Sequence, residues 1–206
     1  HVNIPGFKGG DRETIELPSI QSRLLAELKK AGKKIVFVNF SGSAIALTPE
    51  SKTCDAILQA WYPGQAGGTA IANVLFGDYN PAGRLPVTFY KSTSQLPGFE
   101  DYSMKGRTYR YMTEAPLFPF GHGLSYTTFR YGDASLSTQE VKDGEQTILT
   151  IPVSNAGERD GEEVVQVYLR RPGDKEGPSH ALRAFKRVNI AKGATSNVTV
   201  SLSKED

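Results

Sequence analysis

The strongest candidate for a ligand-binding site is the run Gly9-Gly10-Asp11-Arg12, which stands ahead of the first expected helix. Glycines followed by an aspartate and an arginine allow a sharp turn that presents a carboxylate and a guanidinium, and such a pair can bind a polar ligand. A simpler interpretation is a loop in which Asp11 and Arg12 only pair with each other. From the residues alone both interpretations stay open.

A second glycine-rich run, Gly64-Gln-Ala-Gly-Gly68, opens the second expected helix. A helix N-terminus of this kind can bind a phosphate group. The run has neither the G-x-G-x-x-G spacing of dinucleotide sites nor the Lys-Ser/Thr pair of a P-loop. A tight strand-to-helix turn is therefore the favoured interpretation.

Other residue types with catalytic potential are scattered. His1, His122 and His180 lie far apart in the chain, so no metal site is predicted, and no cofactor is expected. Cys54 has no partner in a CxxC pattern and is expected to be a structural thiol. The run Ser41-Gly-Ser43 is not the G-x-S-x-G turn of a nucleophilic serine. No pair of carboxylates stands out as a general acid with its counterpart.

The composition excludes several classes of partner. The chain has 206 residues and a formal net charge of +2, so it lacks the long-range field expected of a protein that binds nucleic acid or an anionic membrane. Hydrophobic residues make up 38% and charged residues 22%, which is typical of a folded globular protein. No apolar run approaches the roughly 18 residues of a membrane-spanning helix.

The first half of the chain shows the pattern of an α/β layer. Leu17–Lys30 has apolar residues at helical spacing, and Gly32 is placed to end that helix. Lys34–Phe40 is nearly continuously apolar, as in a strand buried on both faces. Helix, strand, strand, helix, strand indicates an α/β layer with some parallel pairing; the later elements are the strand Ala56–Tyr62, the helix Gln65–Phe76 and the strand Arg84–Tyr90.

Beyond the first half, Lys91–Gly123 has no convincing period, but its aromatic content favours a packed loop. The rest of the chain has only strand signals, which predict an antiparallel sandwich of immunoglobulin-like type. Such a sandwich usually has about seven strands, so five strands look incomplete. The expected strands are Asp133–Val141, Glu145–Ser154, Glu162–Arg170, Ala181–Ile190 and Ser196–Leu202.

Several strings of this sequence, taken together, are typical of one family: Pro5–Arg12, Ile15–Pro18, Asn39–Ser43, Trp61–Gly68, Phe76–Pro86, Gly106–Tyr111 and Phe118–Tyr126. They resemble the C-terminal part of glycoside hydrolase family 3. The resemblance covers essentially the whole chain, and the strings follow one another in the family's order. Gly106-Arg-Thr-Tyr-Arg110 is more similar to the β-xylosidase branch than to the general β-glucosidases.

The resemblance implies two domains. Residues 1–125 would belong to a partial α/β sandwich domain, and residues 126–206 to a partial domain of fibronectin type III type. The parent would be a retaining exo-glycosidase, in which two carboxylates act on the same bond. Its nucleophilic aspartate is expected on a barrel domain, and its acid/base glutamate on an acidic stretch shortly before Pro5. No catalytic residue is therefore assigned here, and the missing barrel would be a partner, within one polypeptide or as a separate chain.

The same resemblance suggests supporting residues. Gly10, Asp11 and Arg12 would shape the loop of the acid/base residue. Arg107, Tyr109 and Arg110 would buttress the site or contact the leaving-group side of the substrate; an interdomain clamp is the alternative. Phe118–Tyr126 would be an interdomain hinge, in which Gly121 and Gly123 permit unusual backbone angles.

Three functions compete. The first is part of a β-xylosidase that acts on terminal sugars of plant-type oligosaccharides or on aryl glycosides, with a β-glucosidase as its alternative. The second is a carbohydrate-binding module, and the third is a structural module without activity. A periplasmic or secreted location follows from the resemblance alone. A binding module would show an aromatic platform on its sandwich, and none is visible in the pattern around Tyr168 and Phe185.

Overall fold

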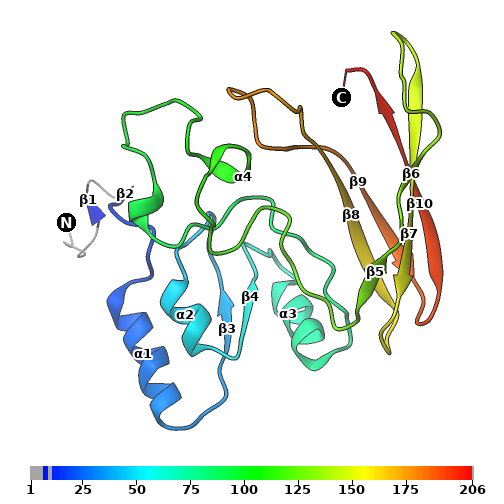
Figure 1. Ribbon diagram of the computed structural model, residues 1–206. Coiled ribbons are helices and arrows are strands. Elements are labelled where there is room, and N and C mark those ends of the chain that lie inside the picture. The colour runs from blue at the N-terminus through cyan, green and yellow to red at the C-terminus, as the bar shows by residue number, and fades with distance from the viewer. Residues whose placement is uncertain (1–6, 9–10, 206) are drawn as a thin grey trace. The chain divides into compact units, whose positions relative to one another are not determined.

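The computed structural model describes residues 7–8 and 11–205. Its contacts divide the chain into two compact units. Unit 1 consists of His1–Ile71 and Val87–Phe120, and unit 2 of Ala72–Pro86 and Gly121–Asp206. Each unit is therefore built from two separate segments of the chain (Figure 1).

Unit 1 contains a parallel strand pair beside helices, which confirms the α/β class expected from the sequence. Strand β3 (Val36–Asn39) pairs in parallel with β4 (Ala56–Gln59), and α2 (Thr48–Thr53) lies between them in sequence. Helix α1 (Ser19–Lys30) packs against α2. The lysines in the last turn of α1 interact favourably with the partial negative charge at the C-terminal end of the helix. Gly32 (φ +72°) adopts the left-handed conformation that ends many helices.

The remaining elements of unit 1 are short. Strand β1 (Phe7–Lys8) pairs antiparallel with β2 (Asp11–Arg12). A 3-10 turn, η1, covers Thr93–Gln95, and a single helical turn, α4, covers Thr108–Tyr111. Helix α3 (Gly67–Phe76) crosses from unit 1 into unit 2 and begins two residues later than expected.

One prediction for the first half was wrong, and one helix was missed. The strand expected at Arg84–Tyr90 is absent, and only Phe89 forms an isolated bridge, with Phe118. The backbone of this segment instead pairs near its two ends, at Leu85 with Gly121 and His122 and at Phe89 with Leu117 and Phe118. Pro86, between them, has no N–H to donate. Helix α2 was not expected, although Pro49 suits the first position of a helix.

Unit 2 contains the antiparallel sandwich expected from the second half of the sequence. One sheet has the order β10-β7-β5, with β6 also paired to β7, and the other pairs β8 with β9. The strand expected at Asp133–Val141 is reduced to β6, and β5 was missed. The strands are β5 (Phe129–Tyr131), β6 (Ser135–Leu136), β7 (Gln146–Asn155), β8 (Gly161–Leu169), β9 (Ala181–Ile190) and β10 (Thr195–Ser203).

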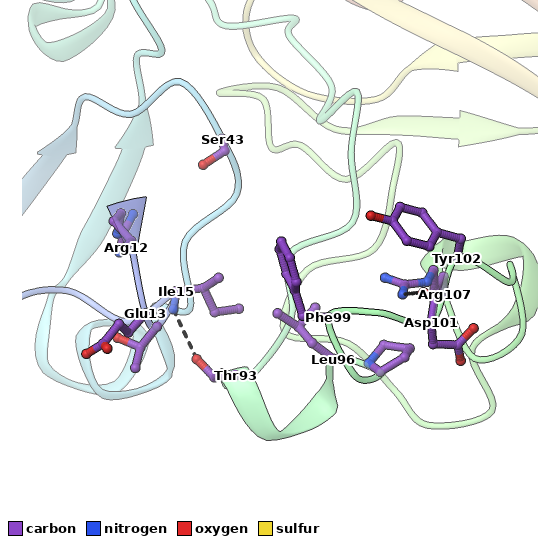
Figure 2. A pocket seen from close by; sticks show the side chains of 12 residues that line it. Arg12, Glu13, Ile15, Ser43, Thr93, Leu96, Phe99, Asp101, Tyr102 and Arg107 are labelled. Carbon is purple, nitrogen blue, oxygen red and sulfur yellow. Dashed lines mark hydrogen bonds between the residues drawn. The ribbon is translucent and has the colours of Figure 1, made fainter. Parts of the chain in front are cut away.

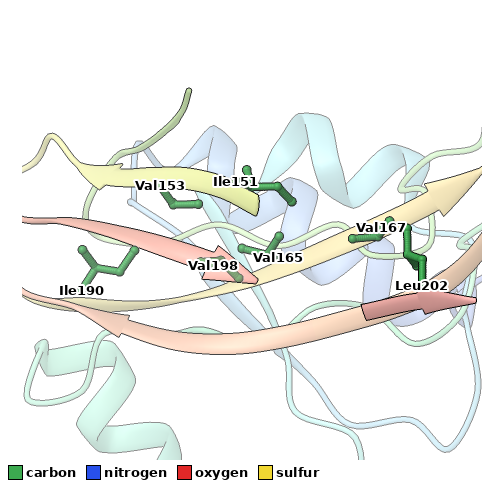
Figure 3. Close-up of a cluster of buried hydrophobic side chains, with 7 residues drawn as sticks. All are labelled: Ile151, Val153, Val165, Val167, Ile190, Val198 and Leu202. Atoms are coloured by element: carbon green, nitrogen blue, oxygen red, sulfur yellow. The ribbon is translucent and has the colours of Figure 1, made fainter. Parts of the chain in front are cut away.

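Apolar side chains from both sheets form the core of the sandwich (Figure 3). In β8 every second residue from Gly161 to Val167 is buried, which is the period of a strand with one face inward. This alternation explains why the sequence pattern located β8 to within one residue. The core residues are Ile151, Val153, Val165, Val167, Ile190, Val198 and Leu202.

Segment Ala72–Pro86 packs on β8 and its neighbours within unit 2. Asn80 Nδ2 donates to the carbonyl of Asp160 at 3.0 Å, and Arg84 Nη2 donates to the carboxylate of Glu163 at 2.9 Å. Tyr79 Oη donates to Glu162 Oε2 at 3.0 Å. The loop that follows α3 is thus fixed by polar contacts to the strand.

The string Phe118–Tyr126 contains the point at which the two units divide, between Phe120 and Gly121. Gly121 has the positive φ (+79°) expected for it. Gly123 has no positive φ; it is needed for close packing, because a Cβ there would lie 2.3 Å from the carbonyl oxygen of Gly83. Among the residues that the structure describes, no helix has the length and apolar character needed to cross a membrane.

Candidate functional site

A polar network lies at the carboxyl ends of the parallel strands β3 and β4. Asn39 Nδ2 donates to Gln59 Oε1 at 2.6 Å and to Ser41 Oγ at 3.1 Å, and Gln59 Nε2 also donates to Ser41 Oγ. Ser41 Oγ in turn donates to the carbonyl of Ser43. These bonds fix the loop that leaves β3. Ligands of α/β proteins commonly bind at this edge of the sheet.

Loops of unit 1 enclose a pocket of about 690 Å³, with Ser43 on one wall (Figure 2). Its volume lies within the range typical of small-molecule sites. The lining combines aromatic rings, aliphatic groups and both signs of charge. The lining residues are Arg12, Glu13, Thr14, Ile15, Ser43, Thr93, Leu96, Pro97, Phe99, Asp101, Tyr102 and Arg107.

Glu16 holds the segment around Arg12 against η1. Its carboxylate accepts the backbone N–H of Thr93 at 2.8 Å and the Thr93 hydroxyl at 2.6 Å. Ile15 N–H donates to the same hydroxyl at 3.0 Å, as Figure 2 shows. Burial alone would raise the pKa of Glu16, but the hydrogen bonds from Thr93 outweigh it and lower the pKa. Glu16 therefore has a positioning role.

Arg12 is the member of the predicted Gly-Gly-Asp-Arg site whose side chain the structure describes. Its side chain lines the pocket, is exposed, and donates from Nη2 to the carbonyl of Glu16 at 2.6 Å. Gly10 lies outside the described residues, and Asp11 is described only by its backbone in β2. The predicted pairing of Asp11 with Arg12 and its alternative therefore both remain predictions.

Arg107 closes the loop that carries the aromatic side of the pocket. Its Nε donates to the carbonyl of Ser103 at 2.9 Å, and its Nη2 donates to the carbonyl of Asp101. The Asp101 carboxylate accepts the N–H of Ser103 at 2.8 Å, and this bond lowers the pKa of Asp101. The guanidinium thus bonds to two carbonyls of its own loop and at the same time lines the pocket.

The structure separates Tyr109 and Arg110 from this pocket. The Tyr109 ring stacks on Phe120 with centroids 4.6 Å apart, and the Arg110 guanidinium lies over the Tyr111 ring at 6.0 Å. Neither side chain lines the pocket. Thr108, just before them, has a positive φ of 55°, and its N–H donates to Tyr90 Oη at 2.9 Å.

Of the residues that line the pocket, sequence reasoning selected only Arg12 and Arg107. It missed the other lining residues, Thr93, Phe99 and Tyr102 among them, and it missed Glu16, which bonds to Thr93. Phe99 and Tyr102 line the pocket and are 95% and 89% exposed. The aromatic content of Lys91–Gly123 was the available signal, but it was interpreted as packing. Among residues 7–8 and 11–205, no group of three or more His, Cys, Asp or Glu side chains is placed to hold a metal ion.

Comparison with protein families gives two matches. Residues 5–126 match the glycosyl hydrolase family 3 C-terminal domain, and residues 163–206 match a fibronectin type III-like domain. The first match includes the pocket and the loop that follows α3, and the second begins within β8.

Similar proteins agree with these matches. The chain is 58% identical to a xylan 1,4-beta-xylosidase of Xylanibacter ruminicola, over 99% of the chain and 23% of the relative. It is 37% identical to a periplasmic beta-glucosidase of Salmonella typhimurium, over 96% of the chain and 28% of the relative. The solved structure of a β-glucosidase from Erythrobacter marinus has a TM-score of 0.85 and 38% identity, over 99% of this chain and 27% of that one.

The chain therefore spans about a quarter of the length of these relatives. Its match to the family's C-terminal domain covers more than half of its residues and includes every residue of the described pocket. On this evidence the chain belongs to glycoside hydrolase family 3, of which it represents the C-terminal α/β domain followed by a fibronectin type III-like domain.

Proposed function

We propose that this chain is the C-terminal part of a retaining exo-β-glycosidase that releases xylose from the non-reducing ends of plant-type oligosaccharides. The observation that carries the proposal is the 58% identity, over nearly the whole chain, to a protein named xylan 1,4-beta-xylosidase. The pocket supports it, because its mixture of aromatic and charged side chains suits a ligand that is apolar on its faces and polar at its edges.

In this proposal the chain forms one wall of the active site. Retaining hydrolysis needs a carboxylate nucleophile and a second carboxyl group that protonates the leaving oxygen, about 5–5.5 Å apart. The resemblance assigns both to segments outside this chain. Glu16 already accepts two hydrogen bonds from Thr93, and Asp101 accepts one from Ser103. We therefore assign Glu16 and Asp101 to positioning, and propose that residues 1–125 and 126–206 are the two domains.

A β-glucosidase is the second candidate. The 37% identity to a periplasmic beta-glucosidase and the fold similarity to a β-glucosidase structure favour it. The name of the Salmonella relative also supports a periplasmic or secreted location for the parent enzyme. We propose the barrel domain and a glycoside substrate as the partners of this chain.

The test is a comparison between the complete polypeptide that contains this chain and the 206-residue chain by itself. The complete enzyme is expected to hydrolyse xylobiose with a higher kcat/KM than cellobiose, with retention of anomeric configuration. The isolated chain is expected to hydrolyse neither, because general acid catalysis alone contributes only about 10²–10⁴-fold. Preference for cellobiose would favour the β-glucosidase. Hydrolysis by the isolated chain that disappears in Asp11→Asn would contradict the assignment of both carboxylates to other segments.

A further inference from the structure

Arg110, on the single turn α4, is half-buried and lacks a hydrogen-bond acceptor. Its Nε atom is buried and has no partner among the residues that the structure describes. The Tyr111 ring lies near the guanidinium, with its centroid 6.0 Å from Cζ, but a ring does not replace an acceptor for Nε. An N–H that is withdrawn from water without a partner costs free energy, and an arginine N–H can only donate. The side chain is therefore incomplete as it stands in these 206 residues.

The turn that carries Arg110 is strained and is held by specific hydrogen bonds. Thr108 has a φ of +55°, which is rare for a β-branched residue. Its N–H donates to Tyr90 Oη at 2.9 Å, and the N–H of Tyr109 donates to Thr88 Oγ1 at 3.0 Å. The N–H of Arg110 donates to Thr108 Oγ1 at 3.3 Å. Backbone strain persists only where the surroundings fix it, and it is concentrated at sites that hold a side chain for a ligand or partner.

A carboxylate is the group that best completes such a site. Its two oxygens accept from Nε and a terminal nitrogen of one guanidinium together, and its charge balances the cation. Because Nε of Arg110 is already withdrawn from water, the pairing regains a hydrogen bond without further desolvation of that atom. The carboxylates of the pocket do not fill this role, because Arg110 does not line the pocket. The chain spans about a quarter of the length of its relatives, so most of their residues belong to segments outside it.

We propose that Arg110 binds an aspartate or glutamate side chain of the parent polypeptide, from a segment outside these 206 residues. The inference rests on the proposed function, in which the barrel domain is the partner of this chain. Arg110 is then a docking residue, and the strained turn at Thr108 sets the direction from which the partner is met. Arg107, three positions earlier, closes the loop of the pocket. The ion pair at Arg110 therefore also ties that loop to the docked segment.

The experiment measures thermal unfolding of the complete polypeptide. Arg110→Met keeps the length of the side chain but leaves the partner carboxylate unpaired, and is expected to lower Tm by about 5 °C or more. Arg110→Lys should recover only part of this loss, because an ammonium group cannot bind both oxygens as a fork. Arg23→Met is the matched control at an exposed arginine of α1, and should change Tm by about 1 °C or less.

A second series identifies the partner in the complete polypeptide. Each aspartate or glutamate outside these 206 residues is changed to its amide, alone and together with Arg110→Met. At one position the amide is expected to lower Tm as much as Arg110→Met does, and the double variant no further than either single variant, because both changes remove the same pair. Additive losses at every position would overturn the proposal, since Arg110 would then act only within its own chain.

A Tm of Arg110→Met equal to that of the wild type would also overturn the proposal. Glucuronic acid then tests a soluble source of the carboxylate: a rise in Tm that occurs in the wild type and not in Arg110→Met would assign Arg110 to a ligand and not to the polypeptide. The readout is stability, so it does not depend on turnover. A complete polypeptide that hydrolyses no glycoside would contradict the proposed function, whereas the coupling of Arg110 to a carboxylate would still be decided by the double variants.

Discussion

Arg84 and Glu163 form a buried salt bridge across 79 positions of the chain. Arg84 Nη2 lies 2.9 Å from Glu163 Oε2 and 3.1 Å from Oε1, and the two side chains are only 12% and 9% exposed. Glu163 Oε1 also accepts the N–H of Val164. The pair therefore links the loop after α3 to the sandwich.

Removal of one charge of this pair is expected to be costly. Glu163→Gln leaves the Arg84 guanidinium buried and uncompensated, which should lower the free energy of unfolding by about 3 kcal/mol. Urea unfolding of the chain measures this loss. Glu27→Gln is the matched control in the exposed pair Glu27–Lys30, and should cost about 0.5 kcal/mol or less. If both substitutions lower the free energy of unfolding equally, burial does not make the Arg84–Glu163 pair more important for stability than an exposed pair.

Asp55 should make stability depend on pH in acid. The N–H of Ile35 and the ammonium groups of Lys29 and Lys34 lower the pKa of Asp55 from 3.8 to about 2. The folded chain then binds fewer protons than the unfolded chain. The contribution of Asp55 to the free energy of unfolding is present above pH 3.8 and is lost as the pH falls towards 2.

Carbon-13 NMR titration of the Asp55 carboxyl group should give a midpoint near 2. Asp55→Asn should remove the part of the acid-dependent loss of stability that this group causes. A midpoint near the ordinary value of 3.8 would contradict the hydrogen-bonded geometry around this carboxylate.

Thr93 should prove to be a positioning residue. Thr93→Val removes the hydroxyl that donates to Glu16 and accepts from Ile15, so the chain should lose about 1–3 kcal/mol of unfolding free energy. Thr93→Ser keeps the hydroxyl and should restore most of this stability. Urea unfolding of both variants is the measurement. If the serine variant is as unstable as the valine variant, the hydroxyl is not the stabilising group.

Arg107→Ala should act through the loop that Arg107 closes. Without the guanidinium the bonds to Asp101 and Ser103 are lost, so limited proteolysis of the loop should accelerate several-fold. In the complete enzyme we expect kcat/KM for xylobiose to fall. Arg107→Lys should not rescue either property, because an ammonium group cannot reproduce the fork of a guanidinium. A variant with an intact loop and little turnover would instead assign Arg107 a direct contact with the sugar.

The apolar stripe of α1 should bind hydrophobic dyes. Ile20, Leu24 and Leu28 follow one another at helical spacing and are exposed. Exposed apolar patches of this kind mark interaction or aggregation sites. Leu24→Lys should reduce dye fluorescence of the 206-residue chain several-fold, whereas Leu124→Lys, an exposed leucine of unit 2, should change it little. Equal dye binding by both variants would show that the stripe is not the binding surface.

The fold was predictable where the pattern of the sequence is local. The alternation around Val165 and Val167 located β8, and the apolar run before Asn39 located β3. The prediction for Arg84–Tyr90 failed because this segment forms separate hydrogen bonds at Leu85 and Phe89 and no continuous ladder. Its sequence pattern does not distinguish this arrangement from a strand. Sequence pattern could identify β8 because burial of one face of a strand leaves an alternating signal in consecutive residues.

The candidate site was only partly predictable. Arg12 was selected from its Gly-Gly-Asp-Arg run and Arg107 from a family string, and both line the pocket, whereas Tyr109 and Arg110 do not. The bonds that shape the site link residues far apart, such as Glu16 and Thr93 at 77 positions, or end on backbone carbonyls, as those of Arg107 do. Backbone carbonyls occur at every residue, so contacts of this kind leave no signal in the sequence.

The loop after α3 has a consequence for how such chains can recombine. Tyr79, Asn80 and Arg84 belong by sequence to the α/β domain match, yet they bond to Glu162, Asp160 and Glu163 beside or within β8. A crossover near residue 126 would pair a loop from one parent with a strand from another. Chimeras should remain folded only where both parents keep the matching charges. The loop after α3 and the first residues of β8 are therefore expected to be inherited together, as a single unit of exchange.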